Sequence, residues 1–257
     1  MEKNPVKGQT VFITGASSGI GKACAQQFAA LGAHLIITAR RADRLQTLAS
    51  ELSSEHGISC TPIQLDVQNH KQVQSAASNL EVDILVNNAG LALTSDKIQD
   101  GKVENWDTMI DTNVKGLLYV TKAILPSMLK KNHGHIINIG SIAGHGCYTA
   151  GNVYCATKHA VRALSKSMRL DLMGTAIRVS EIAPGAVETE FSEVRWNDKS
   201  KAKTFYQGFQ PLVADDIANA VVYCATRPSH VNVAELVIFP QAQASLTDLY
   251  REEKPER

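Results

Sequence analysis

The chain has 257 residues, and its 26 basic and 25 acidic side chains leave a formal net charge of +1. A composition of 44% hydrophobic and 20% charged residues is typical of a soluble globular protein and excludes a mainly disordered chain. The near-neutral charge argues against a nucleic-acid partner or an anionic membrane surface, because such binders carry a concentrated basic excess.

The lack of a recognisable targeting signal and the scattered spacing of the cysteines both point to a reducing compartment. Residues 1–9 hold no apolar run long enough for a signal peptide, and no later stretch approaches the roughly 18 apolar residues of a membrane span. Five scattered cysteines form no C-x-x-C pair. His133 and His135 have no acidic or cysteine partner at ligand spacing. We therefore expect a cytoplasmic protein with no membrane partner and no metal.

Apolar runs alternate with helix-length amphipathic segments along the whole chain. Seven runs are predicted strands: 10–14, 34–38, 63–65, 84–86, 135–139, 177–182 and 236–239. Because they are apolar without strict alternation, both faces of the sheet should be covered, as in a parallel sheet. Asp43 is the expected N-cap of the helix after the second strand. Residues 107–125, after Trp106, are predicted to form one long helix despite Gly116.

Strand–helix repetition of this kind predicts a single α/β domain over residues 1–257, a doubly wound seven-stranded parallel sheet with helices on both faces. Two segments interrupt the rhythm. Residues 188–211 are polar and could form a substrate-loop insertion over a cleft, and residues 240–257 form a tail whose charged end should fray. A plain surface loop and a plain terminus are equally good interpretations.

A glycine-rich turn joins the first strand to the first helix. Its sequence is Thr14-Gly15-Ala16-Ser17-Ser18-Gly19-Ile20-Gly21. Glycines here let the backbone turn sharply and bring helix N-terminal N–H groups to a pyrophosphate. The spacing is neither G-x-G-x-x-G nor that of a phosphate loop. A tight strand–helix connection without a ligand is the alternative.

The end of the second strand indicates which dinucleotide binds. No carboxylate stands there to accept a bond from a ribose 2′-hydroxyl; instead the strand ends in Arg40 and Arg41. Guanidinium groups form charge-assisted bonds to phosphate, so the pair favours a 2′-phosphate and hence NADP(H) over NAD(H). The alternative is a solvated basic start to a helix.

The ordered motifs resemble the short-chain dehydrogenase/reductase family over residues 8–240. They are Thr14-Gly15-x-x-x-Gly19-Ile20-Gly21, Asn87-Asn88-Ala89-Gly90, Asn113, Ser141, Tyr154-x-x-x-Lys158 and Pro184-Gly185. Residues 87–93, 132–141, 151–154 and 189–195 further resemble the NADP-dependent 3-hydroxy acid dehydrogenases, a group also named for serine 3-dehydrogenase and L-allo-threonine dehydrogenase activity. The resemblance implies a Rossmann-type fold, a homotetramer in which the helix after Trp106 pairs between subunits, and oxidation of the 3-hydroxyl of short hydroxy acids.

Tyr154 and Lys158 are the predicted catalytic pair. Four residues apart on a predicted helix, their side chains emerge on one face. A tyrosine with a pKa near 10 needs a lowering of about 3 units to act as a base at neutral pH, and a nearby ammonium can supply part of it. The resemblance implies that Lys158 also bonds the nicotinamide ribose, that Ser141 donates to the substrate oxygen, and that Asn113 holds a water between Lys158 and solvent.

The resemblance also implies further cofactor and substrate contacts. Asn88, Ala89 and Gly90 would border the adenine ribose, Asp66 and Val67 the adenine, and Ile182, Pro184, Gly185, Val187 and Thr189 the nicotinamide and its phosphate. A 3-hydroxy acid needs a cation for its carboxylate, and Arg195 is the candidate, with a plain surface arginine as the equal alternative. The substrate pocket is expected to be lined by Ser141, Ile142, Gly185, Phe191 and Val194.

Three functions follow, in order of preference. The first is an NADP-dependent dehydrogenase of 3-hydroxy acids or β-hydroxy amino acids. The second is a carbonyl reductase of the same family that acts on ketones, steroids or 3-oxoacyl compounds. The third is a non-catalytic cofactor-sensing protein, which the set Asn113, Ser141, Tyr154 and Lys158 disfavours. Cys147 and Cys155 flank Tyr154, and we interpret them as packing residues in preference to a redox switch.

Overall fold

Seven parallel strands form the main sheet of the computed structural model, which describes residues 5–252. Their order across the sheet is β3-β2-β1-β4-β5-β6-β9. The strands are β1 (Thr10–Thr14), β2 (His34–Ala39), β3 (Cys60–Gln64), β4 (Ile84–Asn87), β5 (Gly134–Ile139), β6 (Ile177–Pro184) and β9 (Glu235–Ile238). All seven predicted strands are present, with ends that differ by at most three residues.

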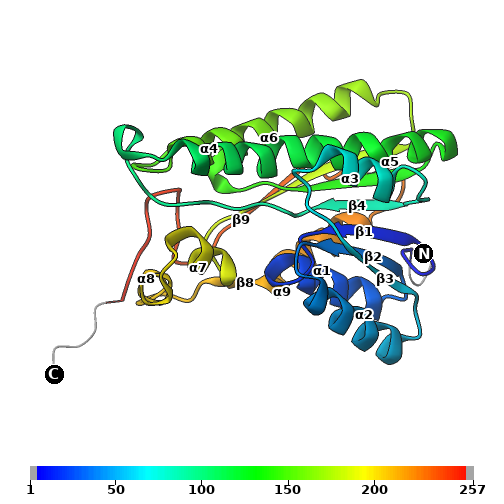
Figure 1. Cartoon of the computed structure of the whole chain (residues 1–257), viewed down its shortest axis with the longest axis horizontal. Helices are drawn as coiled ribbons and strands as arrows, with labels where there is room; N and C mark the ends of the chain where they lie inside the picture. The colour runs from blue at the N-terminus through cyan, green and yellow to red at the C-terminus, as the bar shows by residue number, and fades with distance from the viewer. Residues whose placement is uncertain (1–4, 253–257) are drawn as a thin grey trace.

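Helices cover both faces of this sheet, as Figure 1 shows. One layer holds α1 (Gly19–Ala30), α2 (Ala42–His56) and α9 (Ala214–Ala225). The other holds α3 (His70–Ala77), α4 (Val103–Ile110), α5 (Leu117–Lys131) and α6 (Asn152–Asp171). The doubly wound prediction is therefore confirmed.

The continuous apolar runs of the strands are explained by burial on both faces. In β1, Val11 and Ile13 pack with Phe28 of α1 in one core cluster, whereas Phe12 packs with Ile124 of α5 in the other. All five side chains have 0% exposed surface. Burial of a Val, Ile or Phe side chain contributes about 1.5–3 kcal/mol, so both layers hold the sheet.

The strand order reverses between β1 and β4. From β1 the chain continues to β2 and β3 toward one edge of the sheet, and from β4 it continues to β5 and β6 toward the other edge. In open α/β sheets, ligands bind at such a switch point, outside the carboxyl ends of the strands. The loops after β1, β4, β5 and β6 meet there, and the functional site is built from them.

Two helix predictions differ from the structure. Asp43 is not the N-cap of α2: the cap is Arg41, and Asp43 lies in the first turn, where its negative charge favours the helix N-terminus. The predicted helix 107–125 is three segments: α4, the π-helical turn η2 (Asp111–Gly116) and α5. Gly116 ends the π turn against Val67, whose Cγ2 would lie 2.7 Å from a Cβ at Gly116. A larger residue there would push these elements apart.

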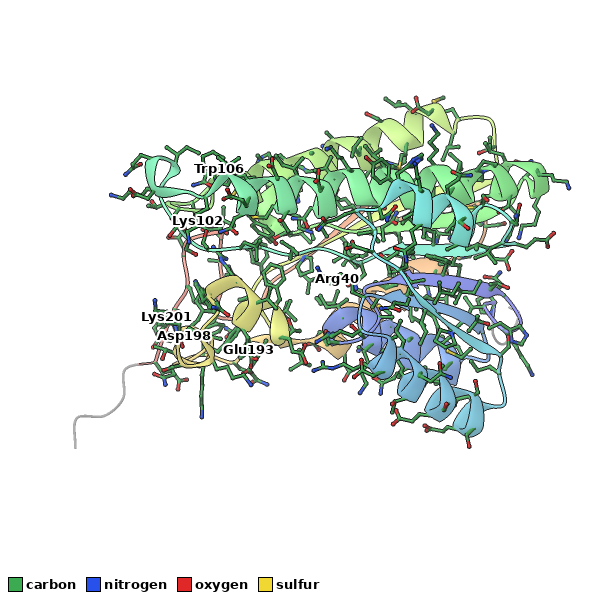
Figure 2. All side chains as sticks on the ribbon, in the orientation of Figure 1. Arg40, Lys102, Trp106, Glu193, Asp198 and Lys201 are labelled. Carbon is green, nitrogen blue, oxygen red and sulfur yellow. The ribbon has the colours of Figure 1, made fainter. Side chains whose placement is uncertain are left out.

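The irregular segment 188–211 folds into helices at the carboxyl ends of the strands. It holds α7 (Glu190–Trp196) and α8 (Lys199–Phe205), flanked by the short paired strands β7 (Val187–Glu188) and β8 (Leu212–Val213). Two short 3-10 turns, η1 (Ile98–Asp100) and η3 (Ile142–Gly144), complete the elements. In Figure 2 the charged side chains Glu193, Asp198 and Lys201 lie at the outer end of this segment.

The described part of the tail is ordered, contrary to the simple terminus considered from sequence. Gln243 pairs with Leu249 through an antiparallel bridge and is only 9% exposed. The backbone N–H of Glu252 donates to the carbonyl oxygen of Gly208 at 2.7 Å, which ties the tail to the segment after α8. The predicted fraying concerns residues 253–257, which lie outside the described residues. Among residues 5–252, no helix is long and apolar enough to span a membrane.

Candidate active site

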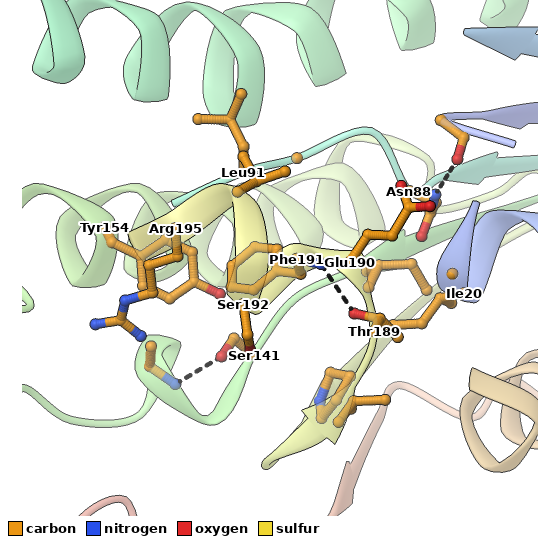
Figure 3. Close-up of a pocket in the computed structure, with 18 of the residues that line it drawn as sticks. Ile20, Asn88, Leu91, Ser141, Tyr154, Thr189, Glu190, Phe191, Ser192 and Arg195 are labelled. Carbon is orange, nitrogen blue, oxygen red and sulfur yellow. Dashed lines mark hydrogen bonds between the residues drawn. The ribbon is translucent and has the colours of Figure 1, made fainter. Parts of the chain in front are cut away.

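A cleft of about 700 Å³ opens at the carboxyl ends of β1, β4, β5 and β6. Its walls come from the glycine turn, the loops after β2, β4 and β5, the start of α6, and α7. Figure 3 shows Phe191 and Arg195 of α7 beside the Tyr154 ring, with Asn88 and Ile20 at the other end of the view. The volume falls within the range of ligand pockets, about 300–1,000 Å³.

The glycine turn packs against the loop after β4 so closely that larger residues do not fit. Gly15 has a φ of +67°, and a Cβ there would lie 3.0 Å from Cα of Ala89. At Gly21 a Cβ would come within 2.5 Å of the Gly15 carbonyl oxygen. Asn88 holds the turn by donating from Nδ2 to the Thr14 carbonyl oxygen at 2.8 Å. Gly21 does not line the cleft, and its role is this close packing.

Arg40 and Arg41 both line the cleft beside the glycine turn, and Arg41 is held in place. Its Nη2 donates to Ser18 Oγ at 2.7 Å, and its Nη1 forms an ion pair with Glu190 of α7 at 2.9 Å. Arg44 pairs with the second oxygen of the same carboxylate at 2.7 Å. The bond from Arg41, with help from Arg44, lowers the pKa of Glu190 to about 2. This end of the cleft therefore carries a net positive charge from its arginines and is connected to α7 through Glu190.

Tyr154, Lys158 and Ser141 meet at the other end. Helix α6 places Lys158 Nζ 5.9 Å from the centre of the Tyr154 ring, and Nζ donates to the Ile139 carbonyl oxygen at 2.9 Å. Ser141, the first residue after the β5 loop glycine, hydrogen-bonds to Tyr154 and also accepts from the Ala143 N–H at 3.1 Å. The four-residue spacing on α6 thus brings Tyr154 and Lys158 together as expected, and the loop after β5 brings Ser141 to them.

The protein alone does not lower the pKa of Tyr154. Burial raises the pKa of this phenol above its usual value, and the bond from Ser141 offsets only part of the increase. Burial also lowers the pKa of Lys158 to about 8, against the opposing effect of Glu181. Lys158 is 7% exposed, so its ammonium acts in a low-dielectric setting where each nearby charge counts strongly.

Asn113 lies in the π turn and fixes the loop after β4. Its Oδ1 accepts from the Leu91 N–H at 2.8 Å, while Nδ2 donates to the Leu91 carbonyl oxygen at 2.8 Å and to Thr157 Oγ1 at 3.1 Å. Because Thr157 precedes Lys158, these bonds connect the loop to α6. Asn113 does not itself line the cleft, and the expected water between it and Lys158 stays a prediction.

Arg195 points into the cleft and is positioned by three neighbours. Its Nη2 donates to Tyr148 Oη at 2.9 Å and its Nε to Ser95 Oγ at 3.3 Å. The guanidinium carbon lies 5.9 Å from the centre of the Tyr154 ring. The Arg195 carbonyl oxygen also accepts from the Thr94 N–H at 2.8 Å, so α7 is joined to the loop after β4. This arrangement places a fixed cation beside the Tyr154 phenol.

Most of the residues predicted for the site line one cleft. Those that line it are Gly15, Ser17, Ser18, Gly19, Ile20, Arg40, Arg41, Val67, Asn88, Ala89, Gly90, Ser141, Ile142, Tyr154, Lys158, Pro184, Gly185, Val187, Thr189, Phe191, Val194 and Arg195. Asp66 does not: its Oδ1 accepts from the Gln68 N–H at 3.0 Å and supports the turn after β3.

Sequence reasoning missed several lining residues. Tyr148 stands in the irregular stretch before α6, and Gln243, Leu246 and Thr247 come from the tail. Gln243 Oε1 accepts from the Ala186 N–H at 2.9 Å, which fixes the loop after β6. No local pattern marks the tail residues, because the return of the chain to the cleft places them. For Tyr148, an aromatic hydroxyl six residues before Tyr154 was an available signal.

Cys155 and His135 are buried in structural surroundings, whereas Cys147 and His133 are exposed, so the interpretation of Cys147 as a packing residue is wrong. Cys155 is buried and burial raises the pKa of its thiol, which agrees with packing and not with a reactive thiolate. His135 Nε2 lies 2.8 Å from Ser180 Oγ, and burial lowers its pKa to about 3. His135 is therefore a neutral side chain in the sheet at physiological pH.

Comparison with known proteins places this fold and site in a family. The sequence profile described as short chain dehydrogenase matches residues 9–200. The chain belongs to the short chain dehydrogenase family.

Individual family members are similar over nearly their whole length. The chain is 46% identical over 241 residues, 91% of its length, to an Escherichia coli protein named NADP-dependent 3-hydroxy acid dehydrogenase, covering 96% of it. It is 45% identical over 241 residues to sulfoacetaldehyde reductase 2 of Chromohalobacter salexigens, covering 91% of this chain and 95% of that one. A solved structure of this family, the closed form of serine dehydrogenase complexed with NADP⁺, superposes with a TM-score of 0.88 at 44% identity, over 97% of this chain and 100% of that chain.

Proposed function

We propose that this short chain dehydrogenase transfers a hydride between NADP(H) and the 3-hydroxyl or 3-oxo carbon of short 3-hydroxy acids or β-hydroxy amino acids. The observation that carries the proposal is Arg195, a guanidinium held by Tyr148 and Ser95 beside the Tyr154 ring. A cation one short carbon chain away from the base suits a substrate that carries a carboxylate near its hydroxyl.

The cleft fits a dinucleotide with a 2′-phosphate. Gly15 and Gly19 hold positive φ angles of 67° and 52° and leave the turn open to a pyrophosphate at the start of α1. Arg40 and Arg41 stand at the end of β2, where the adenine ribose of such a ligand lies in this fold. NADP supplies the hydride acceptor or donor when bound. The glycine turn, the two arginines and the loops after β4 and β6 would hold it.

Tyr154 would take the proton from the substrate hydroxyl during oxidation and return it during reduction. Ser141 would donate to the same oxygen and stabilise negative charge on it. Because burial raises the Tyr154 pKa, the phenolate depends on the Lys158 ammonium 5.9 Å from its ring centre and on positive charge delivered with the oxidised cofactor. Asn113 would keep Lys158 in contact with solvent through a bound water.

Arg195 would bind the substrate carboxylate and thereby fix the reacting carbon. The guanidinium already donates from Nη2 and Nε, which limits its rotation before a substrate arrives. Preorganisation of this kind reduces the entropy that binding must remove. Ile142, Phe191 and Val194 also line the cleft and offer apolar contacts to a short aliphatic chain.

The test is a substrate panel with the purified protein. NADPH absorbance is followed while NADP⁺ is offered with L-serine, allo-threonine, 3-hydroxyisobutyrate, 3-hydroxypropionate or uncharged secondary alcohols. Turnover confined to the acids is the expected result. Turnover of the neutral alcohols alone would reject the acid substrate and keep the family.

A carbonyl reductase acting on ketones, steroids or 3-oxoacyl compounds is the second candidate. The apolar wall of Phe191, Val194 and Phe205 favours it, because these side chains would pack equally well against an uncharged substrate. Reduction of such ketones by NADPH, unaffected by neutralising Arg195, would select this function. A protein that binds NADP without turning over any carbonyl compound would instead fit a cofactor-sensing role.

We also propose a cytoplasmic homotetramer in which each chain is one catalytic domain. Four large apolar side chains on α4 and α5 are exposed in the single chain and are available to pair with another copy: Val103, Ile110, Leu118 and Leu129. The five cysteines are free, as expected in a reducing compartment. Light scattering after size-exclusion chromatography tests the assembly: a monomer would contradict it.

A further inference from the structure

A buried glutamate that the proposed mechanism does not use lies behind the catalytic loop. Glu181 is in β6 and is 1% exposed. Among the described residues, neither of its carboxyl oxygens has a hydrogen-bond partner. A buried carboxyl without partners is costly, because it loses its hydration and gains no bond in return. A group kept under these conditions calls for a physical explanation.

The position of Glu181 connects it to both catalytic loop and catalytic helix. A Cβ at Gly140 would meet Oε1 of Glu181 and lie 3.0 Å from its Cγ, so the carboxyl lies directly against this glycine. Gly140 stands between Ile139, whose carbonyl accepts from Lys158 Nζ at 2.9 Å, and Ser141. Gly140, which contacts Glu181, therefore lies between Ile139, the hydrogen-bond partner of Lys158, and Ser141, the hydrogen-bond partner of Tyr154.

Charged groups surround Glu181 on its other sides. Its neighbour on the next strand is Glu235, and one side-chain nitrogen or oxygen each from His145, Glu181 and Glu235 lie within 4.8 Å of one another. Glu235 Oε1 accepts from Arg162 at 2.8 Å and lies 3.1 Å from His145 Nε2. The charges that act on Glu181 are those of Glu235, Lys158, Arg162 and Arg169, and Lys166 acts on Glu235 and His145.

Lys158 forms no direct ion pair with an acidic side chain in the part of the chain that the structure describes, so its counter-charge acts from beyond hydrogen-bond distance. Its ammonium has three donors, and the structure shows one bond, to Ile139. The acidic group that acts on it is Glu181, which raises the lysine pKa against the effect of burial. Burial, reinforced by Glu235, in turn raises the Glu181 pKa to about 7. Burial thus moves the pKa of Lys158 down and the pKa of Glu181 up, and the charge of each group opposes the shift of the other.

We propose that Glu181 is a positioning residue for the reaction: it is the buried counter-ion of Lys158 and keeps the lysine an ammonium over the pH range in which Tyr154 must act as a base. The proposal rests on the proposed catalytic role of Lys158. Without the carboxylate, Lys158 loses its proton at lower pH, and Tyr154 then loses the positive charge that stabilises its phenolate.

The direct test is the titration of Lys158 in Glu181→Gln. Protein with ¹³C-labelled lysine is titrated by NMR, and the Lys158 signal is assigned by its absence in Lys158→Met. Loss of a neighbouring opposite charge should move the Lys158 titration down by at least about one pH unit. The control is Glu51→Gln, an exposed acid on α2, which should leave it unchanged. An unchanged Lys158 titration in Glu181→Gln overturns the proposal.

Kinetics separate this role from a merely structural one. In Glu181→Gln the alkaline limb of the pH profile of kcat/KM should move down with the Lys158 titration, while KM for NADP⁺ stays within about twofold. A loss of the same factor at every pH would mean that the glutamate only supports the loop, and would reject the proposal.

A second variant covers the case in which Glu181→Gln does not fold. Glu235→Gln, at a partly exposed position, removes the charge that raises the Glu181 pKa. Glu181 should then stay ionised to lower pH, so the step that Glu181 ionisation causes in the Lys158 NMR signal should move to lower pH. A Lys158 signal with no such step in either protein would contradict the proposal. Because the NMR titration needs no substrate, a protein that turns over none of the acids would reject the proposed function and leave this result intact.

Discussion

The preference for NADP over NAD depends on Arg41, and its replacement by alanine tests that dependence. Arg41 lines the cleft at the end of β2, and its guanidinium is held by Ser18 and Glu190 at 2.7 and 2.9 Å. A hydrogen bond to a charged group contributes about 1.5–3 kcal/mol. The Arg41 side chain is 41% exposed, so solvent screens the contact and the lower end applies. Since about 1.4 kcal/mol is tenfold at 25 °C, KM for NADP⁺ should rise about tenfold.

The assay compares KM and kcat for NADP⁺ and NAD⁺ at a fixed substrate concentration and fixed salt. Arg41→Ala should raise KM for NADP⁺ about tenfold and leave KM for NAD⁺ within about twofold of its original value. Arg44→Ala is the matched control, because Arg44 pairs with the same Glu190 but does not line the cleft. It should leave the ratio of the two cofactors unchanged. If Arg41→Ala raises KM for NADP⁺ and KM for NAD⁺ by the same factor, this residue does not recognise the 2′-phosphate.

Four further outcomes are expected. Arg195→Ala should raise KM for 3-hydroxy acids at least about tenfold by loss of a charge-assisted bond, with neutral alcohols within twofold; steady-state kinetics on both classes decide. Tyr154→Phe should lower kcat at least about 10²-fold while NADPH binding, followed by fluorescence, is kept; near-normal turnover would contradict the assignment. Gly140→Ala should lower the melting temperature measurably, because the added methyl meets Glu181. His135 has a folded pKa of about 3, below its unfolded value of about 6.5, so the unfolded chain takes up the proton first as pH falls. Its contribution to stability is complete above about pH 6.5 and decreases by about 1.4 kcal/mol per pH unit down to about pH 3. His135→Gln should remove that part of the slope in urea unfolding measured between pH 7 and 4; an unchanged slope would refute it.

Local chemistry explains which parts of the site were predictable from sequence. The pair Tyr154 and Lys158 follows from helix geometry alone, since four residues return a side chain to the same face. The arginines at the end of β2 follow from the place of a strand terminus in a parallel sheet. In both cases the neighbours that matter are close in the chain.

Contacts between distant segments were not predictable. Gln243 reaches the loop after β6 only because the tail folds back, and Glu190 reaches Arg41 across 149 positions through the course of α7. The π turn at Asp111–Gly116 replaces the single long helix that the pattern indicated, because tertiary contacts to Leu91 and Val67 decide its path. Glu181 is a charged residue within an otherwise mainly apolar strand. Because both faces of that strand are covered by helices, its side chain is expected to be buried.

Helix α7 crosses the mouth of the cleft with both ends fastened. Its first residue is joined by ion pairs to Arg41 and Arg44, and near its last residue Arg195 accepts a backbone bond from Thr94. Because Arg41 lines the cofactor end of the cleft and Glu190 belongs to α7, this ion pair connects the helix to the place where the dinucleotide would bind. Ionic strength screens the first fastening and spares the second. Added salt should therefore loosen the start of α7, beside the cofactor end of the cleft, more than the end of the helix that carries Arg195.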